Sequence, residues 1–263
     1  MRWLRAYPAL LRIGLAEAVA YRAEFVVWML TTTMPLVMLA LWTAVAREAP
    51  FGRFGHSEFV AYYLAAFIVR SVSGSWVVWQ MNQEIRTGSL SLRLLRPIHP
   101  FLAYSAEHIA AIPLRSLFAL PMAVVLLVAS SGHVVHDPWQ IVMVPFALAG
   151  GWLVTFSTML ILGTLGLFLE RSLALFDVWL GLNAVMSGYL VPLELMPRWL
   201  AGAAHWLPFR YTLGYPVELI IGMTTRTQAV AGLLVQTAYV VILVILALFV
   251  WKRGIRRFEA FGA

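Results

Sequence analysis

The sequence predicts an all-α integral membrane protein with six transmembrane helices. Of its 263 residues, 62% are hydrophobic and only 12% are charged, whereas about half of a soluble domain is apolar and about a quarter is charged. Its apolar stretches are long enough to cross a bilayer, which takes about 20 residues in a helix. These observations together indicate a single transmembrane domain over residues 1–263.

Short polar loops separate the predicted spans. The spans cover residues 25–46, 59–80, 102–129, 141–169, 173–191 and 229–251. The first and the last contain no charged residue, whereas Arg70 lies inside the second and Arg115 lies inside the third, which also contains two prolines. Six spans would place both ends of the chain on the same side of the membrane.

The N-terminal residues 1–24 are predicted to form a helix that lies on the membrane surface. Charged side chains interrupt every apolar run in this stretch, which is unlike a secretory signal peptide. These charged residues are Arg2, Arg5, Arg12, Glu17, Arg22 and Glu24. Basic residues interspersed with leucine, alanine and aromatic residues are typical of an interfacial amphipathic helix.

The formal net charge of +7 would suggest nucleic-acid binding in a soluble protein. Here the basic residues lie between apolar spans, so we expect them to set the topology and to contact anionic membrane lipid, with no nucleic-acid partner. Twelve of the 19 lysines and arginines fall on the side of the two termini and of residues 84–97, and five fall on the other side. This excess predicts that both termini are cytoplasmic. The absence of cysteine excludes disulfides and thiol catalysis.

Residues 192–223 fit neither a plain loop nor a plain span. The stretch is apolar but contains prolines at positions 192, 197, 208 and 216, which would divide a helix into short pieces. We expect a re-entrant hairpin of two short helices in the outer leaflet, covered by protein. Three aromatic residues are expected at the level of the lipid headgroups: Trp199, Trp206 and Tyr211.

Residues 84–97, "EIRTGSLSLRLLRP", combine three arginines with four leucines. A single helix would align Arg86, Ser89, Arg93 and Arg96 as one polar stripe. Alternatively, Gly88 ends an extension of the second span, and Ser89 caps a short helix that stops before Pro97. Both alternatives predict a short amphipathic helix on the cytoplasmic surface. It either sets the topology only or docks a soluble partner.

Two motifs carry a resemblance to a known family. In their order and spacing, "EIRTGSL...LLRPIHP" and "SGYLVPLELMPRWL...LPFRYTLGYPVELIIG" resemble the permease subunit of type-2 ABC exporters. They are most similar to the small six-span branch that includes viologen and multidrug exporter permeases. The resemblance implies that residues 84–97 are the coupling helix, which sits in a cleft of the ATPase subunit. The residues implied in ATPase coupling are Glu84, Arg86, Leu92, Arg93, Leu94, Leu95 and Arg96. The leucines at positions 92, 94 and 95 would anchor the helix, and its arginines would pair with carboxylates of the ATPase.

The same resemblance implies ATP-driven export by alternating access. The substrate would be a hydrophobic or amphipathic drug-like molecule, or a lipid-like one. Two permeases, identical or related, would pair in the bacterial inner membrane above two ATPase subunits. ATP and Mg²⁺ would bind to the ATPase, because this chain contains no G-x-x-x-x-G-K-[ST] motif, and we expect no cofactor in the chain itself.

Two other function classes remain as alternatives, a passive channel and a membrane-embedded enzyme. A channel would be expected to repeat a polar or charged ring along one span, which the sequence does not do. An enzyme would need a cluster of acid–base or metal-binding residues. The nearest approach to one is "HVVHD" at residues 133–137, which is more typical of a solvated outer loop.

Arg70 and Arg115 are candidate residues of a substrate path or of a permease–permease interface. A charge at bilayer depth usually faces the interior of a helix bundle or a wet cavity. Four acidic residues could pair with these arginines: Glu107, Asp177, Glu194 and Glu218. Aromatic residues that could form a wall for an apolar substrate are Trp76, Trp79, Trp152, Phe176 and Trp179. The alternatives are structural ion pairs for the arginines and simple packing for the rings.

Overall fold

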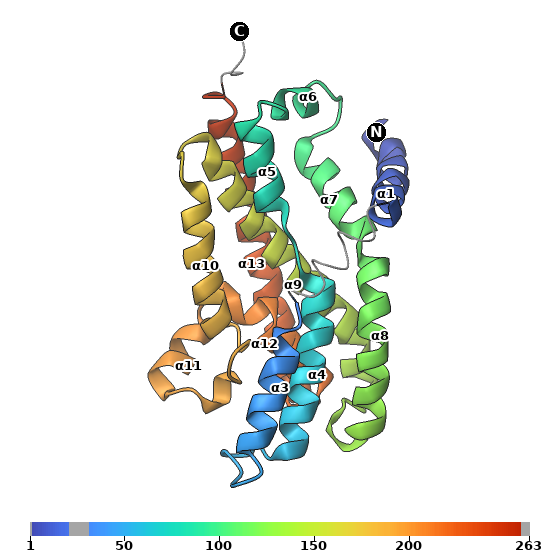
Figure 1. Ribbon diagram of the computed structural model, residues 1–263, viewed down its shortest axis with the longest axis vertical. Coiled ribbons are helices and arrows are strands. Elements are labelled where there is room, and N and C mark those ends of the chain that lie inside the picture. The colour runs from blue at the N-terminus through green and yellow to red at the C-terminus, as the bar shows by residue number, and fades with distance from the viewer. Residues whose placement is uncertain (1, 21–31, 259–263) are drawn as a thin grey trace.

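The computed structural model describes residues 2–20 and 32–258, and most of these residues are helical (Figure 1). Apart from one isolated bridge between Phe51 and Phe54, the described part contains no β-pairing. The predicted all-α membrane fold is therefore confirmed. Residues 21–24 of the predicted surface helix and residues 25–31 of the first predicted span lie outside the described residues.

The helices of the described part differ widely in length. In chain order they are α1 (Arg2–Ala20), α3 (Met34–Val45), α4 (His56–Ser73), α5 (Val77–Arg86), α6 (Leu90–Leu94), α7 (Pro100–Ala110), α8 (Ile112–Ala129), α9 (Pro138–Thr164), α10 (Ser172–Met186), α11 (Arg198–His205), α12 (Gly214–Ile220) and α13 (Arg226–Gly254). Short 3-10 helices lie between some of them, namely η1 (Ser131–His133), η2 (Leu165–Leu167), η3 (Leu193–Leu195) and η4 (Pro208–Thr212).

Four helical stretches of the described residues are long and apolar enough to cross a membrane. They are His56–Arg86, Pro100–Ala129, Pro138–Leu167 and Arg226–Gly254. Two shorter apolar helices, α3 and α10, occur where the first and fifth spans are predicted. The last long helix begins with a capping box in which Thr225 and Gln228 bind each other's backbone N–H groups.

Helix α9 lies in the middle of the bundle and packs against α13, α5, α4 and α12. Helix α1 lies beside α7. The hydroxyl of Tyr7 on α1 forms a hydrogen bond of 3.1 Å with the hydroxyl of Ser105 on α7. In Figure 1 the N-terminus, α6 and the C-terminal end of α13 all lie at one end of the molecule, whereas the turns after α3 and α8 lie at the other. That the two termini share one side of the membrane stays a prediction.

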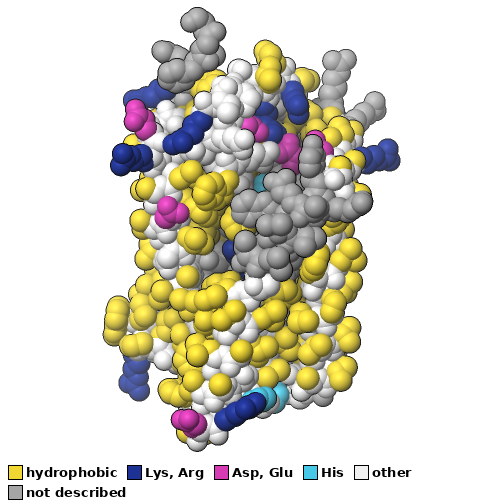
Figure 2. Space-filling model, in the orientation of Figure 1, with side chains coloured by type: hydrophobic (Ala, Val, Ile, Leu, Met, Phe, Trp, Pro, Cys, Tyr) yellow, Lys and Arg dark blue, Asp and Glu magenta, His cyan; other side chains and the backbone are white. Residues whose placement is uncertain are grey.

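The surface between the two ends of the bundle is largely apolar. Figure 2 shows hydrophobic side chains over most of the visible middle of the molecule, with charged side chains mainly toward its two ends. Large apolar side chains on the long helices are exposed, among them Leu117, Val128, Val142 and Ile245. An exposed apolar belt of this kind is expected of a protein whose surroundings are lipid tails.

The second predicted span is not a continuous helix. It begins at His56, stops at Ser73 and resumes at Val77. Between these helices Gly74 is extended, with φ −64° and ψ 138°. The break falls in "SVSGSW", residues 71–76, where small polar residues favour an interruption.

The third and fifth predicted spans also depart from plain helices. Helices α7 and α8 meet at Ala111, two residues before Pro113. A proline has no backbone N–H to donate to the preceding turn, and its ring disfavours a helical conformation for the residue just before it. Helix α10 ends at Met186 rather than at Val191, and Gly188 then adopts φ +84°, a left-handed conformation that favours glycine.

The hairpin predicted over residues 192–223 is built from η3, α11, η4 and α12. It is therefore more fragmented than the two short helices that the prolines predict. Trp199 and Trp206 are 74% and 84% exposed, in keeping with a position at the headgroup level. Tyr211 was expected there too, but this was wrong, because it is buried and its ring lies 5.9 Å from that of Tyr215.

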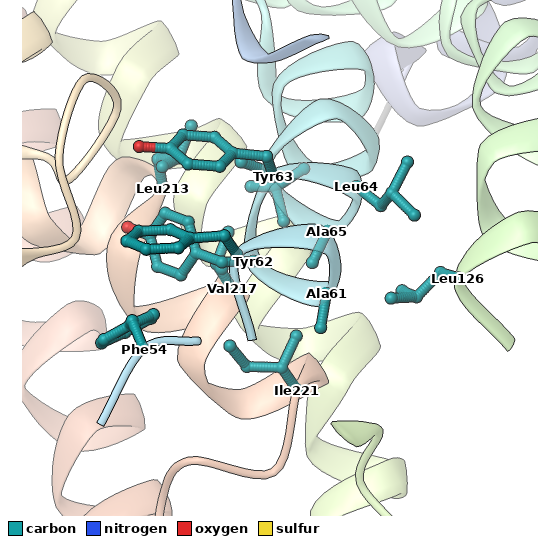
Figure 3. Packing of buried hydrophobic residues seen from close by; sticks show 13 residues of the cluster. Phe54, Ala61, Tyr62, Tyr63, Leu64, Ala65, Leu126, Leu213, Val217 and Ile221 are labelled. Atoms are coloured by element: carbon teal, nitrogen blue, oxygen red, sulfur yellow. The ribbon is translucent and has the colours of Figure 1, made fainter. Parts of the chain in front are cut away.

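Aromatic side chains of α3 and α4 bind the irregular backbone that follows α10. The hydroxyl of Tyr62 donates to the Gly188 carbonyl at 2.7 Å. The hydroxyl of Tyr63 and the indole nitrogen of Trp42 both donate to the Leu190 carbonyl, at 2.8 and 3.0 Å. Figure 3 shows the α4 side of this contact, where Tyr62 and Tyr63 pack near Leu213 and Val217 of the hairpin. Backbone outside a helix at membrane depth needs such partners.

We expect Gly132→Cys and Gly202→Cys to react with an impermeant thiol reagent on intact cells, and Leu95→Cys to be protected. A Cβ at either glycine would meet nothing within 4 Å, and Leu95 is 81% exposed, so all three thiols should be reachable from their own side. The chain has no cysteine of its own to interfere. Permeabilised cells that make the protein without an ATPase partner provide the control, because Leu95→Cys should then react. Labelling of Leu95→Cys in intact cells would contradict the predicted topology.

Candidate functional site

The segment between α5 and α7 forms the first candidate site. Helix α5 ends at Arg86, and Gly88 reverses the chain with φ +73°. Helix α6 then covers Leu90–Leu94. The structure therefore has the glycine-terminated arrangement rather than one continuous helix. Ser89 does not cap α6 with its side chain, because its hydroxyl lies 2.8 Å from that of Thr87 instead.

Arg93 joins α6 to both neighbouring helices. Its Nη2 lies 2.6 Å from Oε1 of Glu84 at the end of α5, and its Nη1 lies 2.8 Å from Oε1 of Glu107 on α7. Tyr104 donates its hydroxyl to Oε2 of Glu84 at 2.6 Å, and its ring centroid lies 4.1 Å from the guanidinium carbon. Burial would lower the pKa of Arg93, but the hydrogen bonds to the two carboxylates raise it above its usual range.

The predicted pairing of Arg93 with an ATPase carboxylate is therefore wrong for this structure, in which Arg93 pairs with carboxylates of its own chain. Only 11% of the Arg93 side chain is exposed, and its carboxylate partners belong to this chain. Arg93 binds Glu84 in a bidentate manner, because its Nε also lies 3.0 Å from Oε2 of Glu84. The guanidinium fixes the position of α6 and leaves little surface for another molecule.

The leucines of this segment divide into an inner and an outer set. Leu90 is fully buried, and Leu94 is half-buried against the same apolar core. Leu92 and Leu95 are 65% and 81% exposed, and Arg96 beside them is also exposed. We call Leu92, Leu95 and Arg96 the docking face. The expectation that Leu94 is an outer anchor is wrong, because the turn at Gly88 sets a register that directs it inward.

The two remaining residues implied in coupling serve the chain itself. Glu84 is held by Arg93 and Tyr104, as described. Arg86 is exposed, and its Nη2 donates to the Glu170 carbonyl at 3.2 Å. This contact connects the end of α5 to the turn before α10.

Arg93→Ala is expected to destabilise the protein by about 3 kcal/mol, because removing one partner of a buried ion pair costs about 3–5 kcal/mol. Glu84 and Glu107 would then lie close together without their cation. Thermal unfolding of the purified protein in detergent measures the loss. Adding Glu84→Gln to Arg93→Ala should restore part of it, whereas Arg96→Ala should change little. Equal melting temperatures for the Arg93 and Arg96 variants would contradict this role.

A cavity of about 290 Å³ forms the second candidate site, at the break between α4 and α5. It is lined by four of the seven residues considered for a substrate path, wall or interface, namely Arg70, Trp76, Trp79 and Arg115. Gln80, Gln83 and His108 line it as well. The structure thus brings together two distant predicted arginines on the wall of one cavity.

Arg115 holds the broken backbone of the second span. It is 8% exposed, and its Nη1 donates to the carbonyl of Gly74. That carbonyl has lost its helical partner because the helix stops at Ser73. The arginine on α8 therefore pins α8 to the break.

Arg70 contacts aromatic rings rather than acids. Its guanidinium carbon lies 5.8 Å from the ring centroids of both Trp76 and Tyr189, a distance that suits a cation–π contact. A second cavity of about 40 Å³ borders Arg70 on the side of α10 and the hairpin, where Asn183 and Thr212 line it. Arg70 consequently touches both spaces.

The acids considered as partners for these arginines lie elsewhere. Glu107 pairs with Arg93 and accepts a hydrogen bond from Gln80, Glu194 pairs with Arg53, and Glu218 pairs with Arg210. In the part of the chain that the structure describes, neither Arg70 nor Arg115 makes an ion pair with a carboxylate. Three of the four proposed pairings are therefore excluded by the partners that these acids have, and Asp177 makes no ion pair within the described residues.

The predicted aromatic residues form a row rather than one cavity wall. Phe176 is 3% exposed, and its ring lies 5.8 Å from that of Trp79 and 6.1 Å from that of Trp179. Trp179 lines the smaller cavity, whereas Phe176 packs against both Trp79 and Trp179. Trp152 is buried and stacks on Phe156 at 4.7 Å, so it packs between helices.

Several lining residues escaped prediction, although some left a signal. Trp76, Gln80 and Gln83 recur at the spacing of one helix face, which places two amides beside a predicted tryptophan. The small residues Ser73, Gly74 and Ser75 indicate the break in the helix there. Tyr189 and His108 had no such signal, because their approach to the arginines depends on how other helices pack.

The loop at residues 133–137 uses its polar residues as structural contacts. Asp137 accepts from Arg226 at 2.6 Å, and this hydrogen bond lowers the pKa of Asp137. His133 lies 3.0 Å from Glu58. Groups of three or more metal-binding side chains do not occur in the part described.

Comparison with known proteins agrees with the resemblance seen in the sequence. Residues 25–262 match the family model described as "ABC-2 family transporter protein". A search of curated proteins gave no match.

Proposed function

Because the chain belongs to the ABC-2 transporter family and is the permease subunit of an ABC transporter, we propose that it exports an amphipathic substrate across a bacterial inner membrane by alternating access. It is the transmembrane component rather than the ATPase, and an ABC ATPase is its implied partner. ATP and Mg²⁺ bind to that partner, and a second permease, identical or related, completes the transporter. Both termini and α6 face the cytoplasm.

The rigid connection between α6 and the larger cavity supports this proposal most directly. Glu107 accepts from Arg93 of α6 at 2.8 Å and from Gln80 of the cavity wall at 2.7 Å. A movement of α6 would therefore be carried to both α5 and α7. The docking face on and just after α6 is exposed to solvent. A partner that binds it from the cytoplasm could therefore move the cavity walls without entering the membrane.

The test is reconstitution of the permease with its ABC ATPase. We expect the ATPase to co-purify with a tagged permease, and the complex in liposomes to move a fluorescent amphiphile only when ATP is present. An ATPase in which the P-loop lysine is replaced provides the control, and it should bind but not drive transport. Movement without ATP would support the passive channel, and chemical alteration of the amphiphile would support the membrane-embedded enzyme.

A further inference from the structure

The larger cavity has a positively charged wall, and none of the described residues that line it is acidic. Arg70 and Arg115 both line it without an ion pair to a carboxylate in the described ranges. A charged side chain at bilayer depth is costly unless a counter-charge or water offsets it. Building on the proposed function, we propose that the exported substrate is an anionic amphiphile whose phosphate or carboxylate binds between these two arginines.

The polar groups at the cavity suit an acidic headgroup. Arginine presents N–H donors in a planar fork that matches carboxylate and phosphate oxygens. Arg115 makes one hydrogen bond among the described residues, to Gly74, although a guanidinium has five N–H donors. His108 is 9% exposed, and its Nδ1 has no hydrogen-bond partner among these residues. A bound anion would offer acceptors to such groups.

The other walls suit an apolar portion. Trp76 and Trp79 line the same cavity, and Trp79 is 43% exposed. The volume of about 290 Å³ lies just below the range of about 300–1,000 Å³ that small-molecule sites occupy. It would hold a headgroup and the first part of a chain, with the rest of the chain lying along the exposed tryptophan.

The sign of the charge separates this proposal from the export of cationic compounds. Two arginines facing one cavity repel a cation such as a quaternary ammonium. Tryptophan rings attract cations, but Trp76 already faces the guanidinium of Arg70 at 5.8 Å. The cavity is thus arranged for a substrate of the opposite charge.

The experiment measures binding of three fluorescent amphiphiles to the purified permease–ATPase complex in nanodiscs. The probes are dodecanoic acid with a terminal fluorophore, its methyl ester, and the trimethylammonium analogue of the same length. We expect the acid to bind at least tenfold more tightly than the other two. Inorganic phosphate at millimolar concentration should compete only weakly, because it lacks the apolar chain. Full competition by phosphate would show a site for free anions and would overturn the proposal for amphiphiles.

Arg70→Gln is the main variant, because Arg70 binds no backbone carbonyl among the described residues and its loss should leave the break intact. It should weaken binding of the acid at least tenfold and leave the methyl ester unchanged. Arg115→Lys retains the charge but not the fork, so it should give an intermediate loss. Arg47→Gln, which removes an exposed arginine from the loop before α4, is the matched control and should change neither.

Glu24→Gln tests the one acidic residue in the part of the sequence outside the described residues that precedes α3. If its carboxylate neutralises the arginines, the unmodified permease will not prefer the acid and Glu24→Gln will, which would overturn the proposal. Equal binding of the three probes, or unchanged binding in Arg70→Gln, would overturn it as well. ATP-driven transport of a neutral amphiphile in either case would leave the proposed exporter function standing.

Discussion

Replacing Leu92 and Leu95 together by aspartate is expected to detach the ATPase and to abolish ATP-driven transport, while the permease still inserts and remains folded. Both side chains are largely exposed, at 65% and 81%, so the chain itself loses little when they change. Burying a leucine at an interface contributes about 1.5–3 kcal/mol. Loss of two such contacts should weaken the ATPase complex by a factor of about 100 or more.

Co-purification of the ATPase with the tagged permease measures this loss, together with ATP-dependent transport in liposomes. Leu92→Met with Leu95→Met is the matched control, because methionine keeps the volume and apolar character of leucine. Leu94→Asp should behave differently from the outer pair, since Leu94 packs inward and its replacement should destabilise the permease itself. A double aspartate variant that retains the ATPase and transports normally would show that α6 only sets the topology.

Gly151→Leu is expected to displace the hairpin from α9 and to cost about 3–5 kcal/mol, by combining overpacking with the loss of a buried hydrogen bond. A Cβ on Gly151 would lie 3.2 Å from the Thr212 carbonyl oxygen and 3.3 Å from that of Tyr211. These atoms belong to the backbone and cannot rotate away. The Tyr211 carbonyl would also move from Gln236, whose Nε2 now donates to it at 2.9 Å.

Thermal unfolding in detergent and resistance of the hairpin to protease measure the effect. Gly181→Leu is the matched control, because Gly181 also lies in a helix but a Cβ there would meet nothing within 4 Å. It should be neutral or slightly stabilising, since leucine is the better helix former. Similar melting temperatures for the two variants would contradict the role assigned to Gly151.

The apolar helices could be predicted from the sequence because burial in lipid leaves a long one-dimensional signal. The breaks left a weaker one: Gly74 lies among serines, and Pro113 marks the junction of α7 and α8. Their structural effect could not be foreseen, because the carbonyl freed at Gly74 is bound by Arg115, 41 residues away on another helix. Hydropathy carries no information about such partners.

The roles within residues 84–97 show the same limit. The composition indicated a charged amphipathic helix, but not which leucines face outward, since that register depends on the left-handed turn at Gly88. The sequence alone predicts that Arg93 pairs with another protein, because nothing in the local pattern shows that Glu84 on α5 and Glu107 on α7 lie beside it. Only the folded arrangement places Glu84 and Glu107 on either side of it.

The hydrogen bonds of the hairpin also have a consequence for membrane insertion during synthesis. The carbonyls of Gly188 and Leu190 bind Tyr62, Tyr63 and Trp42, which leave the ribosome earlier. The Tyr211 carbonyl binds Gln236, which is added 25 residues later. The backbone that leads into the hairpin therefore meets partners that are already made, whereas the Tyr211 carbonyl lacks its Gln236 partner until α13 is made. Completion of the hairpin is thus tied to the last helix of the chain, and a ribosome that stalls before Gln236 leaves the Tyr211 carbonyl without this hydrogen bond.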